Sequence, residues 1–270
     1  RLGGAAGDRA AAVAVHAVGL AAVTLLTLVR REPAEPGRVP ARFYLGGVLG
    51  VGTIFACNFA FTALSASLAV ALSLLGQAGF SLAADAAGFL GRRKYALTPG
   101  RLPGILLAAA GAAVLAGSGK VLWTAVPVAL AAGILPGVSF LLNSELGRRR
   151  GILRSARWNY VTGLAGTVAI AALAGLSPVP AIRSVLAAGP LPALGGGLAG
   201  VAVVATMNFV FPRIPAFTAT ILLFSGQALA GLVLDGAVQG TLDVRKLLGT
   251  AVVLAGLAVD TRLSPKPAGA

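Results

Sequence analysis

Long apolar runs constrain this chain more than any other feature. A helix of about 20 apolar residues is needed to cross the hydrocarbon core of a bilayer. The runs are too long, and too rich in alanine, leucine and glycine, for the alternating strands of a membrane β-barrel. The sequence therefore predicts an all-helical membrane protein with about nine transmembrane helices and no separate soluble domain. The nine runs are residues 11–29, 43–63, 66–90, 102–118, 122–142, 158–177, 191–211, 214–235 and 246–260.

The charges are few and strongly unbalanced. Only 11 % of the residues are charged, and 22 basic residues stand against 8 acidic ones. Such an excess is typical of a nucleic-acid-binding protein or of the loops that orient a membrane protein. If successive runs alternate in direction, 16 basic residues fall on the side of loops 30–42, 91–101 and 143–157, and 6 fall on the other. The positive-inside rule then makes the first side, with the C-terminus, cytoplasmic. Because no aromatic stacking platform accompanies the basic residues, we expect no nucleic-acid partner.

Matches at a constant offset indicate an internal duplication. A colinear series that includes glutamine and aspartate inside apolar runs points to a repeat. Upstream of residue 46 the offset is 144, and Leu2-Gly3 matches Leu146-Gly147 while residues 19–21 match 163–165. The pairs at an offset of 150 are 46–50 with 196–200, 58–61 with 208–211, Gln77 with Gln227, and Asp85 with Asp235.

The two predicted repeats are residues 1–120 and 121–270. The second holds five runs and the first holds four, because nothing upstream corresponds to residues 122–142. We therefore expect that the first repeat lacks its first helix and that a parent protein has ten spans. Five spans per repeat place the two repeats in opposite orientations, which is the architecture of many secondary transporters.

Several segments resemble the YdcZ-like family of the drug/metabolite transporter superfamily. They are Leu-Gly-Gly-Val-Leu-Gly at 45–50, Ala-Leu-Ser-Leu-Leu-Gly-Gln at 71–77, Asp-Ala-Ala-Gly-Phe-Leu-Gly at 85–91, and Gly-Ile-Leu-Pro-Gly-Val-Ser-Phe-Leu-Leu-Asn-Ser-Glu-Leu-Gly at 133–147. The resemblance covers nearly the whole chain, twice over. It implies a bacterial plasma (inner) membrane location and a role in moving a small metabolite or drug.

Polar side chains inside apolar runs are candidates for a substrate-binding site, because they are costly there. Gln77 and Gln227 lie near the middle of their runs, whereas three asparagines lie towards run ends. Either group could instead form interhelical hydrogen bonds, and we favour that alternative for the asparagines. Pro136 is expected to kink or break its helix and free backbone carbonyls for a substrate. The asparagines are Asn58, Asn143 and Asn208.

Asp85 and Asp235 are the acidic residues that lie well within the runs. Each follows its glutamine by eight residues, so the two side chains of a pair can face one groove. One hypothesis makes the aspartates coupling or gating groups, one in each vestibule. The alternative makes them helix-end anchors, paired with basic residues such as Arg92 or Lys246.

These observations predict a secondary transporter that works by alternating access, with export as the expected direction. A non-transporting membrane scaffold or accessory subunit is the alternative. An enzyme is not expected, because Cys57 and His16 are single residues of their types and no catalytic triad, phosphate loop or metal-ligand spacing occurs. We expect no cofactor, and the expected partners are the lipid bilayer and a small-molecule substrate. A homodimer is also compatible with the sequence.

Overall fold

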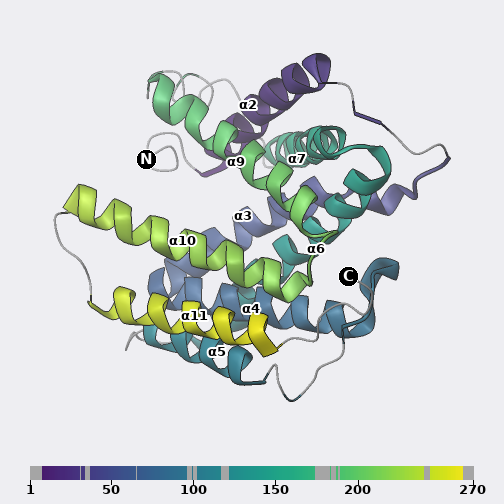
Figure 1. Ribbon diagram of the computed structural model, residues 1–270. Helices are drawn as coiled ribbons and strands as arrows, with labels where there is room; N and C mark the ends of the chain where they lie inside the picture. Colours follow the sequence, from purple (N-terminus) through teal and green to yellow (C-terminus); the bar gives the residue numbers. More distant parts are fainter. Residues whose placement is uncertain are drawn as a thin grey trace. The chain divides into compact units, whose positions relative to one another are not determined.

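The computed structural model describes residues 8–30, 32–33, 37–64, 66–95, 99, 102–116, 122–173, 183, 187, 189–239 and 244–263. Each of the nine apolar runs coincides with an α-helix, and the described residues contain no strand (Figure 1). Leu2-Gly3 and the ends of runs 102–118 and 158–177 lie outside the described residues. The helices are α2 (Asp8–Val29), α3 (Gly46–Ala63), α4 (Ala66–Ala87), α5 (Leu102–Ala116), α6 (Val126–Arg150), α7 (Ile152–Leu173), α9 (Pro190–Val210), α10 (Ala216–Gln239) and α11 (Val244–Leu263).

Four segments are long and apolar enough to cross a membrane. They are Ala12–Val29, Gly46–Ala63, Leu68–Ala87 and Trp123–Arg150. Shorter apolar segments lie in α5, α9, α10 and α11. The structure thus confirms an all-helical chain with membrane-spanning helices, while nine as the number of spans stays a prediction.

The prediction of a loop at residues 143–157 is wrong. Helix α6 continues to Arg150 and α7 begins at Ile152, so Gly151 alone separates them. Glu145 forms salt bridges with Arg148 and Arg149 on the same side of α6, which stabilises this charged last turn. Gly151 ends the helix because its φ of 99° is a conformation that glycine adopts at low cost. Asn143 is therefore inside α6, not near a helix end.

The chain forms two compact units, each built from both predicted repeats. Unit 1 comprises residues 1–58 and 138–213, and unit 2 comprises residues 59–137 and 214–270. Helices α3 and α6 each contribute one part to unit 1 and the other part to unit 2. The division into repeats at 1–120 and 121–270 stays a prediction.

Helices α2, α7 and α9 pack against one another in unit 1 (Figure 1). Their core contains Val23, Ala156, Tyr160 and Val201. Gly19 of α2 lets this helix approach the Tyr160 ring of α7 closely.

Four helices form a closed ring in unit 2. Helix α4 packs on α5 and α10, and α11 packs on the same two helices. Phe217, Ile221 and Phe224 of α10 form the core with Ile105 of α5 and with leucine and alanine side chains of α4. Short 3-10 helices, η1 (Ala41–Tyr44) in unit 1 and η2 (Phe89–Gly91) and η4 (Trp123–Ala125) in unit 2, lie beside the ends of the long helices.

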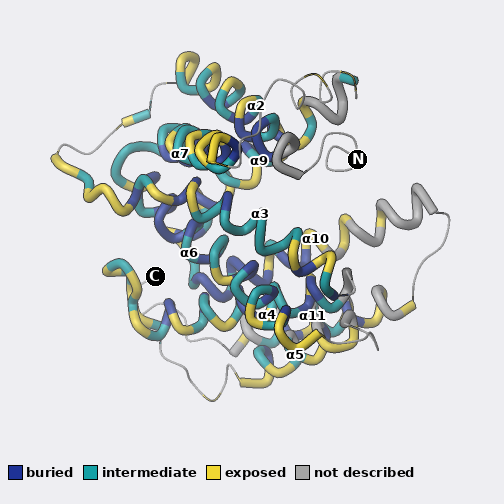
Figure 2. Tube along the Cα trace, turned by 180° about the vertical axis from the view of Figure 1, so that it is seen from behind, coloured by how far each residue is buried: buried dark blue, intermediate teal, exposed yellow. Residues whose placement is uncertain are grey.

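Exposed residues occur along several helices (Figure 2), and many of them have large apolar side chains. Leu25 and Leu28 of α2 and Leu106 of α5 are 64 %, 71 % and 66 % exposed. Several polar side chains are buried, among them Asn143 and Asn208 at 1 % exposure each. Apolar side chains outside and hydrogen-bonded polar groups inside are typical of a protein whose surface contacts lipid.

Candidate functional site

Four polar residues lie at intervals of four along α4. Ser73, Gln77, Ser81 and Asp85 therefore occupy one side of the helix over about 18 Å. Ser73 is half-buried and the other three are buried. We call these four residues the α4 polar stripe. Because an unpaired buried polar group costs free energy, the partners of each residue indicate what the stripe does.

The two serines of the stripe join α4 to its neighbours. The Ser73 hydroxyl donates to the Ala129 carbonyl of α6 at 3.0 Å. The Ser81 and Thr220 hydroxyls lie 2.8 Å apart and link α4 to α10. These bonds are the interhelical hydrogen bonds expected inside a membrane protein.

Asp85 binds the first turn of α10. Its Oδ1 accepts a hydrogen bond from the Ala216 amide at 2.7 Å, and its Oδ2 accepts one from the Phe217 amide at 2.9 Å. The first amides of a helix have no partner within the helix, and its N-terminus favours negative charge. Arg92 donates to the Ile214 carbonyl just before α10 at 3.0 Å. This geometry is that of the helix-end anchor.

Gln77 differs from its neighbours in the stripe. Its side-chain Nε2 is buried and has no hydrogen-bond partner among the residues that the structure describes. At this level α4 and α6 meet backbone to backbone, since a Cβ on Gly76 would overlap the Leu130 carbonyl and one on Gly133 would overlap the Ser73 carbonyl. Gln77 therefore offers an unused donor beside a tight helix crossing.

Pro136 lies inside α6, three residues beyond Gly133. Helix α6 runs from Val126 to Arg150 without interruption, so a break at Pro136 does not occur. Proline lacks the N–H that would bond to the carbonyl of residue 132 within the helix. Within the helix, the Ala132 carbonyl therefore lacks the donor that a residue other than proline would supply at position 136.

The repeat-related residues in α10 have different surroundings. Gln227 is exposed, whereas Gln77 is buried. A Cβ on Gly226 would meet nothing within 4 Å, whereas one on Gly76 would meet α6. Asp235 belongs to α10, but its side chain lies outside the described residues. Gln77 and Gln227 are therefore not equivalent in this structure.

Asn143 belongs to a buried polar cluster in unit 1. Its Nδ2 donates to Asn159 Oδ1 at 2.8 Å and to Ser139 Oγ at 3.3 Å. The main-chain carbonyl of Asn143 accepts a hydrogen bond from the Ser155 hydroxyl at 2.6 Å. The Ser139 hydroxyl donates one to the main-chain carbonyl of Gly46 at 2.9 Å. The cluster joins α3, α6 and α7, which supports the interhelical alternative for Asn143.

Asn208 and Asn58 also lie in unit 1. Asn208 is buried, and its Nδ2 donates to the Ile152 carbonyl at the start of α7 at 3.3 Å. Its Oδ1 has no hydrogen-bond partner. Asn58 is only half-buried. The structure thus places the three asparagines in unit 1 and Gln77, Gln227, Pro136 and both aspartates in unit 2.

Ser139, Ser155 and Asn159 were not among the residues predicted from the sequence to be functional. A usable signal existed, because Ser139 and Asn143, and Ser155 and Asn159, are each four residues apart. Such spacing puts both polar groups on one side of a helix. The signal was hidden because residues 143–157 were expected to form a polar loop.

His16 of α2 and Tyr160 of α7 are separated by 144 positions, the offset of the repeat. Their rings pack edge to face with centroids 5.9 Å apart. A Cβ on Gly19 would overlap the Tyr160 ring, and one on Gly163, 144 positions later, would overlap the His16 ring. The two contacts are therefore reciprocal.

Helices α3 and α9 continue this pattern. Gly47 of α3 approaches the Gly163 amide of α7, and Gly197 of α9 approaches the Gly19 amide of α2. Gly47 and Gly197 are 150 positions apart, and Gly19 and Gly163 are 144 apart. Each contact thus has a counterpart at the repeat-related position.

The chemistry available at these residues is hydrogen bonding. Among the residues that the structure describes, no three His, Cys, Asp or Glu side chains gather as metal ligands. His16 is packed against Tyr160, and Cys57 is half-buried in α3. The unpaired donor of Gln77 and the unpaired acceptor of Asn208 could each bind a polar solute or water.

Comparison with known families decides the class of the protein. The family described as "Putative inner membrane exporter, YdcZ" matches the chain in two segments, residues 1–114 and 124–259. The chain belongs to this family. Membership in the YdcZ family confirms the resemblance and identifies a multi-pass inner-membrane protein of the exporter type.

Solved structures agree with the YdcZ chain at the level of the fold. One of them, named "Crystal structure of protein", has a TM-score of 0.74 and 18 % sequence identity, and the match covers 99 % of this chain and 91 % of that chain. Likeness at this identity concerns the fold alone. No protein of curated function matches the chain significantly.

Proposed function

We propose that this YdcZ-family chain is a secondary transporter that exports a small metabolite or drug across the inner membrane by alternating access. The observation that carries the proposal is the twofold match to an exporter family, in consecutive segments of the chain. Transporters built from two repeats bind their substrate between helices at mid-membrane depth.

An inverted repeat is part of the proposal. A two-fold relation requires that a contact from one repeat to the other be returned at the related positions. The contacts of Gly19 with Tyr160 and of Gly163 with His16 have this property. The contact of Gly47 with Gly163 is likewise returned by that of Gly197 with Gly19. These contacts support a two-fold relation between the two repeats. Opposite orientations and a cytoplasmic C-terminus are proposed from the five spans expected per repeat and from the uneven distribution of basic residues.

Gln77 is the proposed substrate-binding residue in unit 2. Its buried Nε2 lacks a protein partner, so a carbonyl, carboxylate or hydroxyl of a substrate would gain a hydrogen bond there. The Ala132 carbonyl, which Pro136 leaves without its helical donor, would accept from a substrate in the same unit. Asn143 is held by protein partners and acts through helix packing.

Asp85 remains the candidate coupling group beside its role as an anchor, with Asp235 as its repeat-related counterpart. Coupling would require Asp85 to release the α10 amides on protonation, because a protonated carboxyl accepts hydrogen bonds less well. Transport by Asp85→Asn should then lose its dependence on a proton gradient. Unchanged transport over a pH series would contradict coupling.

A flux assay tests the proposed function. The full chain in proteoliposomes should move at least one compound from a broad panel of metabolites and drugs against empty-liposome controls. Saturable flux whose kcat/KM falls about tenfold in the Gln77→Met variant would support the proposal. Normal insertion without flux of any compound would favour a scaffold or accessory subunit.

A further inference from the structure

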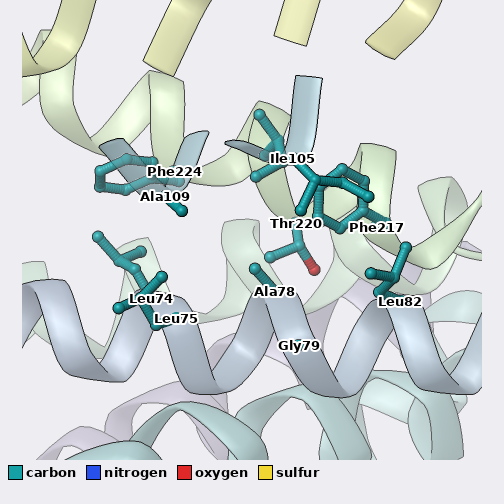
Figure 3. A pocket seen from close by; sticks show the side chains of 11 residues that line it. Leu74, Leu75, Ala78, Gly79, Leu82, Ile105, Ala109, Phe217, Thr220 and Phe224 are labelled. Carbon is teal, nitrogen blue, oxygen red and sulfur yellow. The ribbon is translucent and has the colours of Figure 1, made fainter. Parts of the chain in front are cut away.

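An apolar cavity of about 150 Å³, partly open to the surface of unit 2, lies between α4, α5 and α10 (Figure 3). Leucine and alanine side chains of α4, Ile105 and Ala109 of α5, and Phe217 and Phe224 of α10 surround it. None of the predicted site residues is among the residues that line it. The cavity is therefore distinct from the region around Gln77.

The cavity offers no free hydrogen-bonding side chain among its described lining residues. Thr220 carries the hydroxyl there, and that hydroxyl already pairs with Ser81 at 2.8 Å. A charged or strongly polar ligand would lose its hydration without a replacement. Water is disfavoured for the same reason, since a buried water needs two to four polar partners. The ligand must then be uncharged and apolar.

The size and the lining of the cavity favour a single ring. In another protein, an engineered cavity of about 150 Å³ lined by leucine, isoleucine and phenylalanine stays dry and binds benzene. Phe217 and Phe224 are seven residues apart, so both lie on one side of α10 two turns from each other. Phenylalanine rings attract another ring in edge-to-face or offset geometry.

We propose that this cavity is a binding site for an uncharged apolar ring of about the size of benzene. The ring can belong to a transported molecule or to a separate ligand, because the site itself does not require transport. Binding measured on purified protein therefore tests this proposal independently of the proposed function.

Fluorobenzene is a suitable probe for the full chain purified in dodecyl maltoside. Uptake by the micelle does not saturate, so a site appears as a saturable component in ¹⁹F NMR titrations. Ala78→Leu fills the cavity, whereas Ala83→Leu adds the same atoms at an exposed position of α4 that does not line it. Binding should saturate in the natural chain and in Ala83→Leu, and should be about tenfold weaker or absent in Ala78→Leu.

Ala109→Leu provides a second filled variant from α5, and it should lose binding in the same way even if Ala78→Leu does not fold. Non-saturable uptake by the natural chain would overturn the proposal. Equal binding by the filled variants and Ala83→Leu would overturn it as well. Displacement of the probe by one equivalent of phospholipid would show that a lipid tail occupies the cavity, which also contradicts a ring site.

Discussion

Asp85 illustrates how a polar residue in an apolar helix can be read in two ways. Its position eight residues after Gln77 suggested a coupling group, and its place near the end of a run suggested an anchor. The hydrogen bonds to Ala216 and Phe217 give the anchor a specific partner, the first turn of α10. Sequence alone could not name that partner, because it is 131 residues away along the chain.

The Asp85 carboxylate should contribute measurably to the stability of the protein. Asp85→Ala leaves two buried amides without acceptors, so we expect it to lower the free energy of unfolding by about 2 to 4 kcal/mol. Asp85→Asn keeps one acceptor oxygen and should cost about half as much. Thermal unfolding in detergent measures both. Equal stability of the natural chain and Asp85→Ala would contradict the anchor.

Gln77 and Gln227 provide a matched pair for transport. Gln77→Met removes a buried donor without a partner, so it should lower the transport kcat/KM about tenfold while stability is unchanged or raised. Gln227→Met changes an exposed side chain and should leave transport within about twofold of the natural chain. Flux and thermal unfolding are measured together. Similar flux losses in both variants would contradict a special role for the buried glutamine.

At the scale of helices, close approach depends on glycine at particular crossings. Gly76 and Gly133 let α4 and α6 meet backbone to backbone, and Gly47 and Gly163 do the same for α3 and α7. Gly133 and Gly137 of α6 both face a neighbouring helix, whereas a Cβ on Gly50 of α3 would meet no described atom within 4 Å. A glycine within an apolar run therefore does not by itself show where two helices approach closely.

Alanine substitutions at Gly76 and Gly226, which are repeat-related positions, test whether close helix approach depends on a particular glycine. Gly76→Ala forces a Cβ against the Leu130 carbonyl, and we expect a loss of about 1 to 3 kcal/mol in the free energy of unfolding. Gly226→Ala meets no atom and should be neutral or stabilising by up to about 1 kcal/mol, since alanine favours helix. Chemical or thermal unfolding compares the two. A larger loss for Gly226→Ala would refute the α4–α6 crossing.

Helix ends were less predictable than helices. All nine apolar runs contain a helix, because about 20 apolar residues can satisfy their backbone groups in lipid only as a helix. The junction at Gly151 was not predicted, because charged residues that follow an apolar run can either leave the helix or extend it. Salt bridges of Glu145 with two arginines favour extension here.

At the scale of the whole molecule, the repeats in the sequence and the compact units in space do not coincide. Each unit takes helices from both repeats, and α3 and α6 contribute to both units. A repeat is a record of duplication, whereas a compact unit depends on which faces pack. Helix faces of similar composition cannot be matched to partners from the sequence alone.

The opposite orientation of the repeats leads to a topological prediction. In a Cys57→Ala background, Ala41→Cys should be protected in intact cells and Ala187→Cys should react with a membrane-impermeant maleimide, because loop 30–42 is expected in the cytoplasm and the α7–α9 connection outside. Both positions are exposed in the structure. A fluorescent protein fused to the C-terminus should be fluorescent, because the C-terminus is expected in the cytoplasm. The reverse labelling pattern, or a dark fusion, would refute the proposed orientation.

The sequence by itself determined the class of this protein. Run length, charge distribution and the internal repeat require only local chemistry and counting, and they led to a helical membrane protein with a repeat. The resemblance of several segments then led to the YdcZ family. The sequence could not show that Gln77 and Gln227 differ in burial, since both follow glycine in related apolar runs. Only the tertiary structure showed that Gln77 is buried and Gln227 exposed, because burial depends on neighbouring helices: α6 lies against Gly76, whereas no described atom lies within 4 Å of a Cβ on Gly226.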